Sequence, residues 1–167
     1  MAPKQKPGRS KQDYGTPPEF LAAVKKRLAI DEFDVDLAAS HKNTVVELSY
    51  YTKQDNALVQ DWECGEGWNW LNPPFARIEP WVKRAYEMSM QYGVKTAVLV
   101  PAGVGSNWWR DWVHQKAAIQ LLNGRITFLN CPPNPRTGKV DAYPKDCALL
   151  LYSPYMTEGY DVWSWRE

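Results

Sequence analysis

Apolar residues recur along this chain in two spacings, one typical of helices and one typical of buried strands. Helical spacing covers residues 16–30, 77–93 and 107–116. Short apolar runs predict strands at 32–40, 44–52, 67–71, 94–102, 118–122, 125–130 and 147–153. Strands that alternate with helices, followed by closing strands, predict one α/β domain whose sheet carries helices on both faces.

The first twelve residues do not follow this pattern. The segment 1–12 is rich in Pro and polar residues and contains basic but no acidic side chains: Lys4, Lys6, Arg9 and Lys11. Such a composition predicts a disordered basic tail before a domain spanning 13–167. The tail is either a solubilising terminus or an arm that follows phosphates.

A second irregular stretch, 131–146, separates two predicted strands and is expected to be an inserted loop. Arg136, Lys139 and Lys145 make it basic. A loop of this length in a small domain is usually either functional or disordered, so contact with a substrate and lack of order both remain open.

Composition narrows the class of protein further. The formal net charge of the 167 residues is +1, so the overall charge does not by itself indicate a nucleic-acid partner. Three widely spaced cysteines and two histidines argue against a disulfide framework, a metal site or a His-based hydrolytic triad. No apolar stretch is long enough to cross a bilayer. A cytoplasmic protein without a membrane segment or metal is therefore expected.

The sequence Asn72-Pro73-Pro74-Phe75 directly follows the predicted strand 67–71. Two prolines end the strand and leave Asn72 and Phe75 on a stiff turn at its carboxyl end, where open α/β sheets bind ligands. The Asn72 side-chain oxygen and the Pro73 carbonyl can accept both hydrogens of an exocyclic amine, which frees its lone pair for attack. Phe75 offers a face for a stacked base.

Structural explanations compete with this one. The prolines can simply end a strand, with Phe75 packed into the core. Most of the nine tryptophans are expected to pack as well. Trp108 and Trp109, which follow the predicted central strand, are candidates either for the core or for the wall of a base pocket.

Four motifs in order resemble the phage-type DNA N6-adenine methyltransferases of the Dam family. They are Tyr14–Pro17, Phe33–Ser40, Gln54–Leu58 and Trp70–Phe75, and the later "LVPA", "NWW" and "GRITF" blocks resemble the family too. The similarity extends over about residues 13–153. It implies a Rossmann-like S-adenosylmethionine-dependent methyltransferase that flips adenine out of double-stranded DNA.

The resemblance also implies roles for individual residues. Tyr14, Thr16 and Pro17 would lie beside the methionine end of the cofactor. Asp36 and Ala38 would belong to the cofactor-binding motif, and Asp55 would lie near the adenosine. The catalytic tetrapeptide would be Asn72, Pro73, Pro74 and Phe75. For Asp34, Asp36 and Asp55 the alternative is capping or turn formation.

This chain departs from the family in three respects. It has no glycine after the predicted strand that ends at Asp36, it has Asn-Pro-Pro-Phe where tyrosine is commoner at the last position, and it has Gly103 where an arginine is frequent. The last difference puts one substrate or phosphate contact in doubt.

The expected partner is double-stranded DNA, with phosphate contacts from Lys11, Arg125, Arg136 and Lys139. A monomer or weak dimer is expected, in the host cytoplasm if a phage encodes the chain.

Two other functions stay open. The Asn-Pro-Pro-Phe turn also suits methylation of RNA amines or of the side-chain amide of protein glutamine. A non-catalytic DNA-binding relative that kept the fold is the third hypothesis, and the intact tetrapeptide counts against it.

Overall fold

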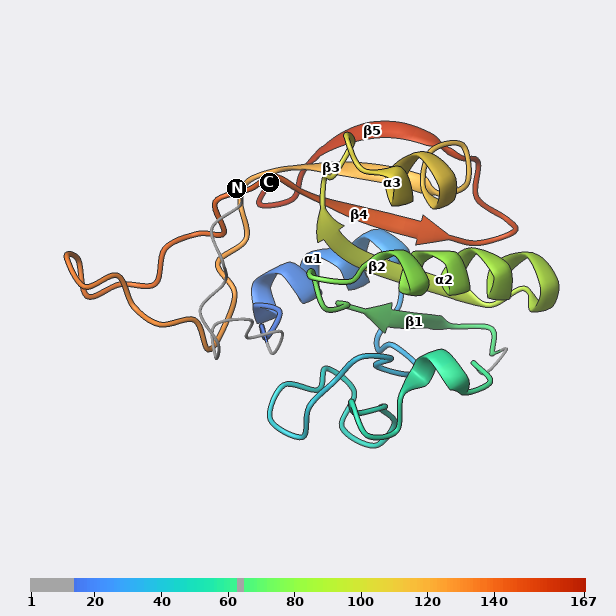
Figure 1. Ribbon diagram of the computed structural model, residues 1–167, viewed down its shortest axis with the longest axis horizontal. Helices are drawn as coiled ribbons and strands as arrows, with labels where there is room; N and C mark the ends of the chain where they lie inside the picture. The colour runs from blue at the N-terminus through green and yellow to red at the C-terminus, as the bar shows by residue number, and fades with distance from the viewer. Residues whose placement is uncertain (1–13, 63–64) are drawn as a thin grey trace.

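The computed structural model describes residues 14–62 and 65–167 (Figure 1). Its elements, in chain order, are α1 (Pro18–Leu28), the 3-10 helix η1 (Ala57–Val59), β1 (Trp68–Leu71), α2 (Glu79–Tyr92), β2 (Lys95–Pro101), α3 (Asn107–Trp112), β3 (Ala118–Asn123), β4 (Cys147–Tyr152) and β5 (Gly159–Ser164). The predicted basic tail 1–12, with Lys11, lies outside the described residues.

The five strands form one mixed sheet in the order β1-β2-β4-β3-β5. β1 and β2 pair in parallel, as do β3 and β5, whereas β4 runs antiparallel to both of its neighbours, β2 and β3. The carboxyl ends of β1, β2, β3 and β5 therefore share one edge of the sheet, and β4 begins at that edge.

Two extended segments widen the sheet beyond β1. Asp36 forms parallel bridges to Trp70 on one side and to Tyr50 on the other. Backbone hydrogen bonds from Trp70 N to Val35 O (2.8 Å) and from Tyr51 N to Asp36 O (2.9 Å) support these bridges. The predicted short strand that ends at Asp36 and the β-rich stretch 44–52 thus pair only through these isolated bridges and form no regular strand, because pairing is limited to a few residues before the chain bends.

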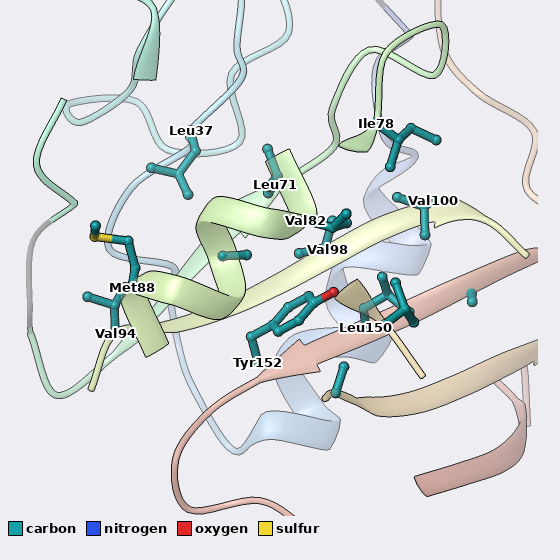
Figure 2. Packing of buried hydrophobic residues seen from close by; sticks show 14 of the residues in the cluster. Leu37, Leu71, Ile78, Val82, Met88, Val94, Val98, Val100, Leu150 and Tyr152 are labelled. Atoms are coloured by element: carbon teal, nitrogen blue, oxygen red, sulfur yellow. The ribbon is translucent and has the colours of Figure 1, made fainter. Parts of the chain in front are cut away.

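Helices cover both faces of the sheet, as predicted. Alternate residues of β2 point to opposite sides: Val98 and Val100 belong to the core under α2 and α3, and Ala97 and Leu99 to the core under α1. Figure 1 shows α2 and α3 in front of the sheet and α1 behind it. Figure 2 shows the α2-side core, where Val82 of α2 meets Val98 of β2.

Helix boundaries follow the sequence signals closely. α1 begins after Pro17, and Pro18 occupies its first position, where the missing N–H costs nothing. α2 ends at Tyr92, and the capping residue Gly93 has φ +68° and donates its backbone N–H to the Ser89 carbonyl. The apolar stripe that predicted α2 is buried at Ile78, Val82, Ala85 and Met88 and half-buried at Trp81.

The predicted strand 125–130 is wrong. Ile126 and Phe128 are buried at alternate positions, which imitates a strand, but among the described residues this segment has no ladder partner beyond a single bridge from Leu129 to Gly15. The segment 131–146 contains neither helix nor strand.

Candidate active site

A crevice is expected where neighbouring parallel strands send their connections in opposite directions. From the segment 34–37 the chain continues to the bridge at Tyr50, on the outer side, whereas from β1 it continues through α2 to β2, on the other side. Ligands of open α/β sheets bind at such a point, outside the carboxyl ends of the strands. Ala38 and Asn72 are the first residues beyond the two strand ends.

The Asn72 side chain is held in a defined orientation at this point. Its Nδ2 donates to the Tyr14 carbonyl at 3.0 Å and to Thr16 Oγ1 at 3.2 Å. Because both partners accept, the amide nitrogen is identified and Oδ1 faces away from them. Within the part of the chain that the structure describes, Oδ1 accepts no hydrogen bond.

The segment before α1 is fixed in place by the rest of the fold. Thr16 is 5% exposed, and Pro17 is the residue immediately before α1. Gly15 accepts a backbone hydrogen bond from Leu129 N at 2.8 Å, and a Cβ on Gly15 would lie 3.0 Å from the Leu129 Cβ. The structure thus brings Asn72 together with Tyr14 and Thr16, which lie 58 and 56 positions before it in the sequence.

Phe75 is half-buried in a cluster of four aromatic rings. Its ring meets Phe128 at 5.8 Å and Tyr143 at 5.5 Å, both edge-on, and Tyr14 stacks on Phe128 at 5.7 Å. Tyr143 belongs to the loop 131–146, so this loop reaches the turn after β1. Sequence reasoning missed Tyr143 and Phe128; an aromatic residue within a basic loop was the available signal for Tyr143.

Asp36 lies at the end of its segment but does not face the crevice freely. The side chain is 2% exposed, and its two oxygens accept from the backbone N–H groups of Val45 (2.9 Å) and Ala38 (3.3 Å). Burial raises the pKa of this carboxyl to about 6, although both hydrogen bonds act to lower it. The geometry is that of a carboxylate that holds the 38–45 loop.

Asp55 is exposed beyond the bridge at Tyr50. One carboxylate oxygen accepts from both the backbone N–H and the hydroxyl of Thr52, each at 2.8 Å. These two hydrogen bonds lower the pKa of Asp55, and the one from the backbone has the larger effect. The Asp55 carboxylate is therefore ionised at neutral pH. The side chain closes a turn and still presents its charge to solvent.

Three of the predicted phosphate-binding residues, Arg125, Arg136 and Lys139, lie in the described part of the chain, and they are not gathered in one place. Arg125 follows β3 at the carboxyl edge of the sheet, and its Nε lies 3.5 Å from Asp146 Oδ1. Arg136 and Lys139 are exposed in a turn at the tip of the loop 131–146, where Asn134 N donates to the Lys139 carbonyl at 2.8 Å. Figure 1 shows this loop projecting away from the sheet and helices.

The two adjacent tryptophans have different environments. Trp109 is 2% exposed and donates from Nε1 to the Tyr160 hydroxyl at 3.0 Å, so it is a core residue. Trp108 is half-buried and lines a cleft at the carboxyl edge of the sheet.

Among residues 14–62 and 65–167, no group of three or more His, Cys, Asp or Glu side chains could hold a metal ion. No helix in the same ranges combines the length and apolar character needed to cross a membrane.

Comparison with known proteins identifies the class. The family model described as DNA N-6-adenine-methyltransferase (Dam) matches residues 4–165, nearly the whole chain. A DNA N-6-adenine-methyltransferase of Haemophilus phage HP1 is 29% identical over 161 residues, which cover 95% of this chain and 89% of the phage protein. The protein is therefore a DNA adenine methyltransferase, and the chain belongs to the Dam family.

A second relative supports the same assignment over a shorter stretch. The DNA N-6-adenine-methyltransferase of Escherichia phage T1 is 31% identical over 114 residues, which cover 68% of this chain and 46% of the T1 protein. The resemblance drawn from the sequence motifs is thus confirmed at the level of the family.

Proposed function

We propose that this protein transfers a methyl group from S-adenosylmethionine to the N6 amine of adenine in DNA, and that the turn Asn72–Phe75 receives the flipped base. The observation that carries the proposal is the orientation of Asn72. Its amide nitrogen is engaged by Tyr14 and Thr16, and its oxygen is left to accept.

The chemistry of the amine explains why such an oxygen is useful. The N6 lone pair of adenine is delocalised into the ring, so the nitrogen is a weak nucleophile. Asn72 Oδ1 and the Pro73 carbonyl can each accept one amine hydrogen, which favours a pyramidal nitrogen with a localised lone pair. No backbone hydrogen bond from the described residues ends on the Pro73 carbonyl, which would therefore be the second acceptor.

Phe75 would stack on the base. Its ring is held edge-on by Phe128 and Tyr143, so stacking requires little reordering of the side chain. Holding the base in place beside the methyl donor would supply the proximity and orientation on which transfer to a weak nucleophile depends.

The cofactor would occupy the crevice at the ends of the segment 34–37 and β1. S-adenosylmethionine supplies an electrophilic methyl group on sulfur. The residues fit such a ligand in part: Asp55 is an ionised, exposed acceptor for hydroxyl groups, and Thr16 lies directly beside Asn72.

Asp36 fits less well as a direct ligand, because its oxygens already accept hydrogen bonds; it would act by holding the 38–45 loop around the crevice. The parallel bridges of Asp36 to Trp70 and Tyr50 favour a Rossmann-like arrangement of this half of the sheet.

The experiment that tests the proposal combines purified protein, S-adenosylmethionine with a labelled methyl group, and plasmid DNA that lacks adenine methylation. Nucleoside analysis should find the label in N6-methyladenine. Asn72→Ala should lower the rate at least about a hundredfold while cofactor binding, measured by calorimetry, stays intact.

Parallel reactions with structured RNA and with protein test the alternative acceptors. Label in either of these but not in DNA would overturn the proposal, as would an Asn72→Ala protein that methylates DNA at the parent rate.

A further inference from the structure

A cleft of about 830 Å³ lies at the carboxyl edge of the sheet. Phe75 and Ile78 line one part of it, and the other walls come from the ends of β2 and β3 with the loops that follow them, from the residues that lead into β4 and from Val162 of β5. Its size falls within the range of about 300–1,000 Å³ that is usual for ligand sites. The cleft therefore has room beside the base that Phe75 would hold.

Trp108 forms a preorganised apolar wall of this cleft. Its indole lies against the backbone of Gly103: a Cβ at position 103 would come within 2.8 Å of Trp108 Cζ2. The neighbouring ring of Trp109 meets it at 5.6 Å and 60°. Glycine at position 103 is therefore what permits the indole to lie here.

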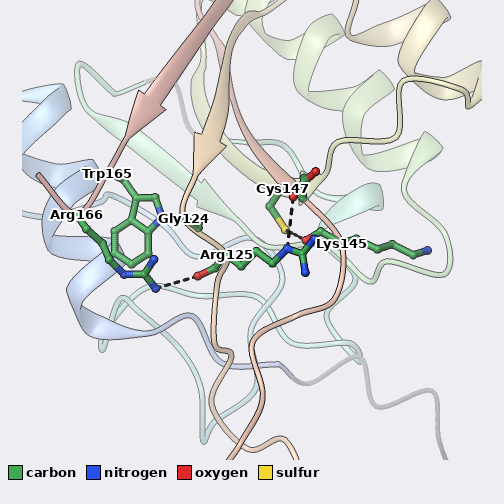
Figure 3. Close-up of polar contacts among 7 residues, drawn as sticks. Gly124, Arg125, Lys145, Cys147, Trp165 and Arg166 are labelled. Carbon is green, nitrogen blue, oxygen red and sulfur yellow. Dashed lines mark hydrogen bonds and ion pairs between the residues drawn. The ribbon is translucent and has the colours of Figure 1, made fainter.

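Two cations flank the same cleft, Arg125 after β3 and Lys145 before β4. The backbone around Arg125 is fixed, because its carbonyl accepts from Arg166 Nη2 at 2.9 Å and the Gly124 carbonyl accepts from Trp165 Nε1 at 2.7 Å (Figure 3). The Arg125 side chain itself is 55% exposed, and its ion pair with Asp146 is long, at 3.5 Å. Such an exposed pair contributes little stability, so a phosphate can replace the carboxylate at small cost.

We propose that this cleft is a second nucleotide subsite, which binds a DNA nucleotide next to the target adenine. The base stacks on the Trp108 indole, and the phosphate is bound by Arg125 and Lys145. This combination of an aromatic face with flanking cations is how proteins bind unpaired nucleotides without reading their sequence. The inference rests on the proposed function, because it takes the ligand to be DNA.

The test measures the binding of a fluorescein-labelled single-stranded oligonucleotide of mixed sequence by fluorescence anisotropy. Unpaired bases enter the cleft without the energy of flipping, so the readout does not depend on methylation. Trp108→Ala should weaken binding roughly five- to 150-fold, as expected for the loss of one stacked base. Trp108→Phe should restore most of the affinity.

Two control variants accompany these measurements. Trp112 lies on the same helix as Trp108, but its indole packs against Tyr86 and does not line the cleft. Trp112→Ala should therefore leave DNA affinity unchanged. Arg125→Ala should reduce the slope of log affinity against log salt concentration by about 0.7, which is the value for one phosphate contact to a single strand. Lys26→Ala, on α1 and away from the cleft, is the matched control and should leave this slope unchanged.

Equal affinity of the parent and Trp108→Ala proteins overturns the subsite. So does a loss in Trp108→Ala that Trp108→Phe fails to restore, or one that Trp112→Ala reproduces. Methylation of plasmid DNA by the parent protein in the same preparation separates such a failure from failure of the proposed function. Conversely, a parent protein that binds DNA but transfers no methyl group contradicts the proposed function. The oligonucleotide affinities of the parent and the Trp108 variants still decide whether the cleft is a nucleotide subsite.

Discussion

The side-chain amide of Asn72 donates to the backbone carbonyl of Tyr14 at 3.0 Å, and so connects the turn after β1 with the segment before α1. The acceptor oxygen of Asn72 owes its direction to this hydrogen bond and to the one with Thr16. The segment before α1 thus sets the orientation of an amide that lies on the turn after β1.

Thr16→Val should lower kcat because it removes one of the two acceptors of Asn72 Nδ2 while keeping the size of the buried side chain. Loss of a neutral hydrogen bond of about 0.5–1.5 kcal/mol corresponds to a fall of roughly two- to tenfold. Steady-state methylation measures it. Thr16→Ser keeps the hydroxyl and should recover the rate; a serine variant as slow as the valine variant would show that the hydroxyl does not orient Asn72.

Asp36 should make the stability of the protein depend on pH. Burial raises its pKa from an ordinary 3.8 to about 6, so the native state holds this proton more tightly than the unfolded chain does. The resulting contribution is fully present below the unfolded value and is lost as the pH rises through about 6. Between about pH 4 and about pH 7 it should decrease by about 2 kcal/mol.

Urea unfolding of the parent and of Asp36→Asn across this pH range measures the effect. The free energy of unfolding of the parent, relative to that of the variant, should decline as the pH rises. A difference that stays constant with pH would contradict burial of an ionisable Asp36.

Tyr143→Ala should impair methylation by loosening Phe75, since the two rings meet edge-on at 5.5 Å. An aromatic pair of this kind is worth about 0.5–1.5 kcal/mol beyond the area that it buries. Tyr143→Phe retains the ring and should behave like the parent in kcat/KM assays. If the phenylalanine variant is as impaired as the alanine variant, the hydroxyl rather than the ring is what matters.

The tip of the loop 131–146 should contact DNA phosphates through Arg136 and Lys139, both of which are exposed. Replacing both with alanine should weaken duplex binding at low salt and lower the slope of log affinity against log salt by about 0.9 for each phosphate that is no longer neutralised. Anisotropy titrations with labelled duplex at several salt concentrations provide the slope. A slope equal to that of the parent would exclude the loop tip from the interface.

Gly124→Ala should destabilise the protein. Gly124 has φ +109°, and a Cβ there would lie 2.7 Å from Arg166 Nη1 and 2.9 Å from Trp165 Nε1. Backbone strain of this kind costs about 1–3 kcal/mol, and thermal unfolding should show it as a lower Tm. Gly105→Ala is the matched control, because a Cβ at that position meets nothing within 4 Å. Equal Tm values for the two variants would contradict the prediction.

Local sequence signals were sufficient where burial is continuous or where proline ends an element. The run 94–102 became β2, and Pro73-Pro74 ended β1 at Leu71. The spacing of apolar side chains such as Ile78 and Val82 predicted the helix α2. In these cases the residues that determine the element lie within it.

Edge and long-range features escaped prediction for the opposite reason. β5 has exposed residues, with Val162 at 66%, and its pairing with β3 gives no apolar run to detect. The contact between Tyr143 and Phe75 joins positions far apart in the chain. Likewise, the hydrogen bonds of Asp36 to the 38–45 loop depend on how that loop folds back, which residue types alone do not specify.

The placement of β4 has a consequence for the order of folding. β2 pairs with β1 on one side and with β4 on the other, yet β4 follows both α3 and β3 along the chain. One edge of β2 therefore stays unpaired during synthesis until residues up to Tyr152 have emerged from the ribosome. Such late, non-local pairing slows folding and leaves an apolar strand open to aggregation in the meantime. The strand that completes the middle of the sheet is thus synthesised late, and of the strands only β5 follows it along the chain.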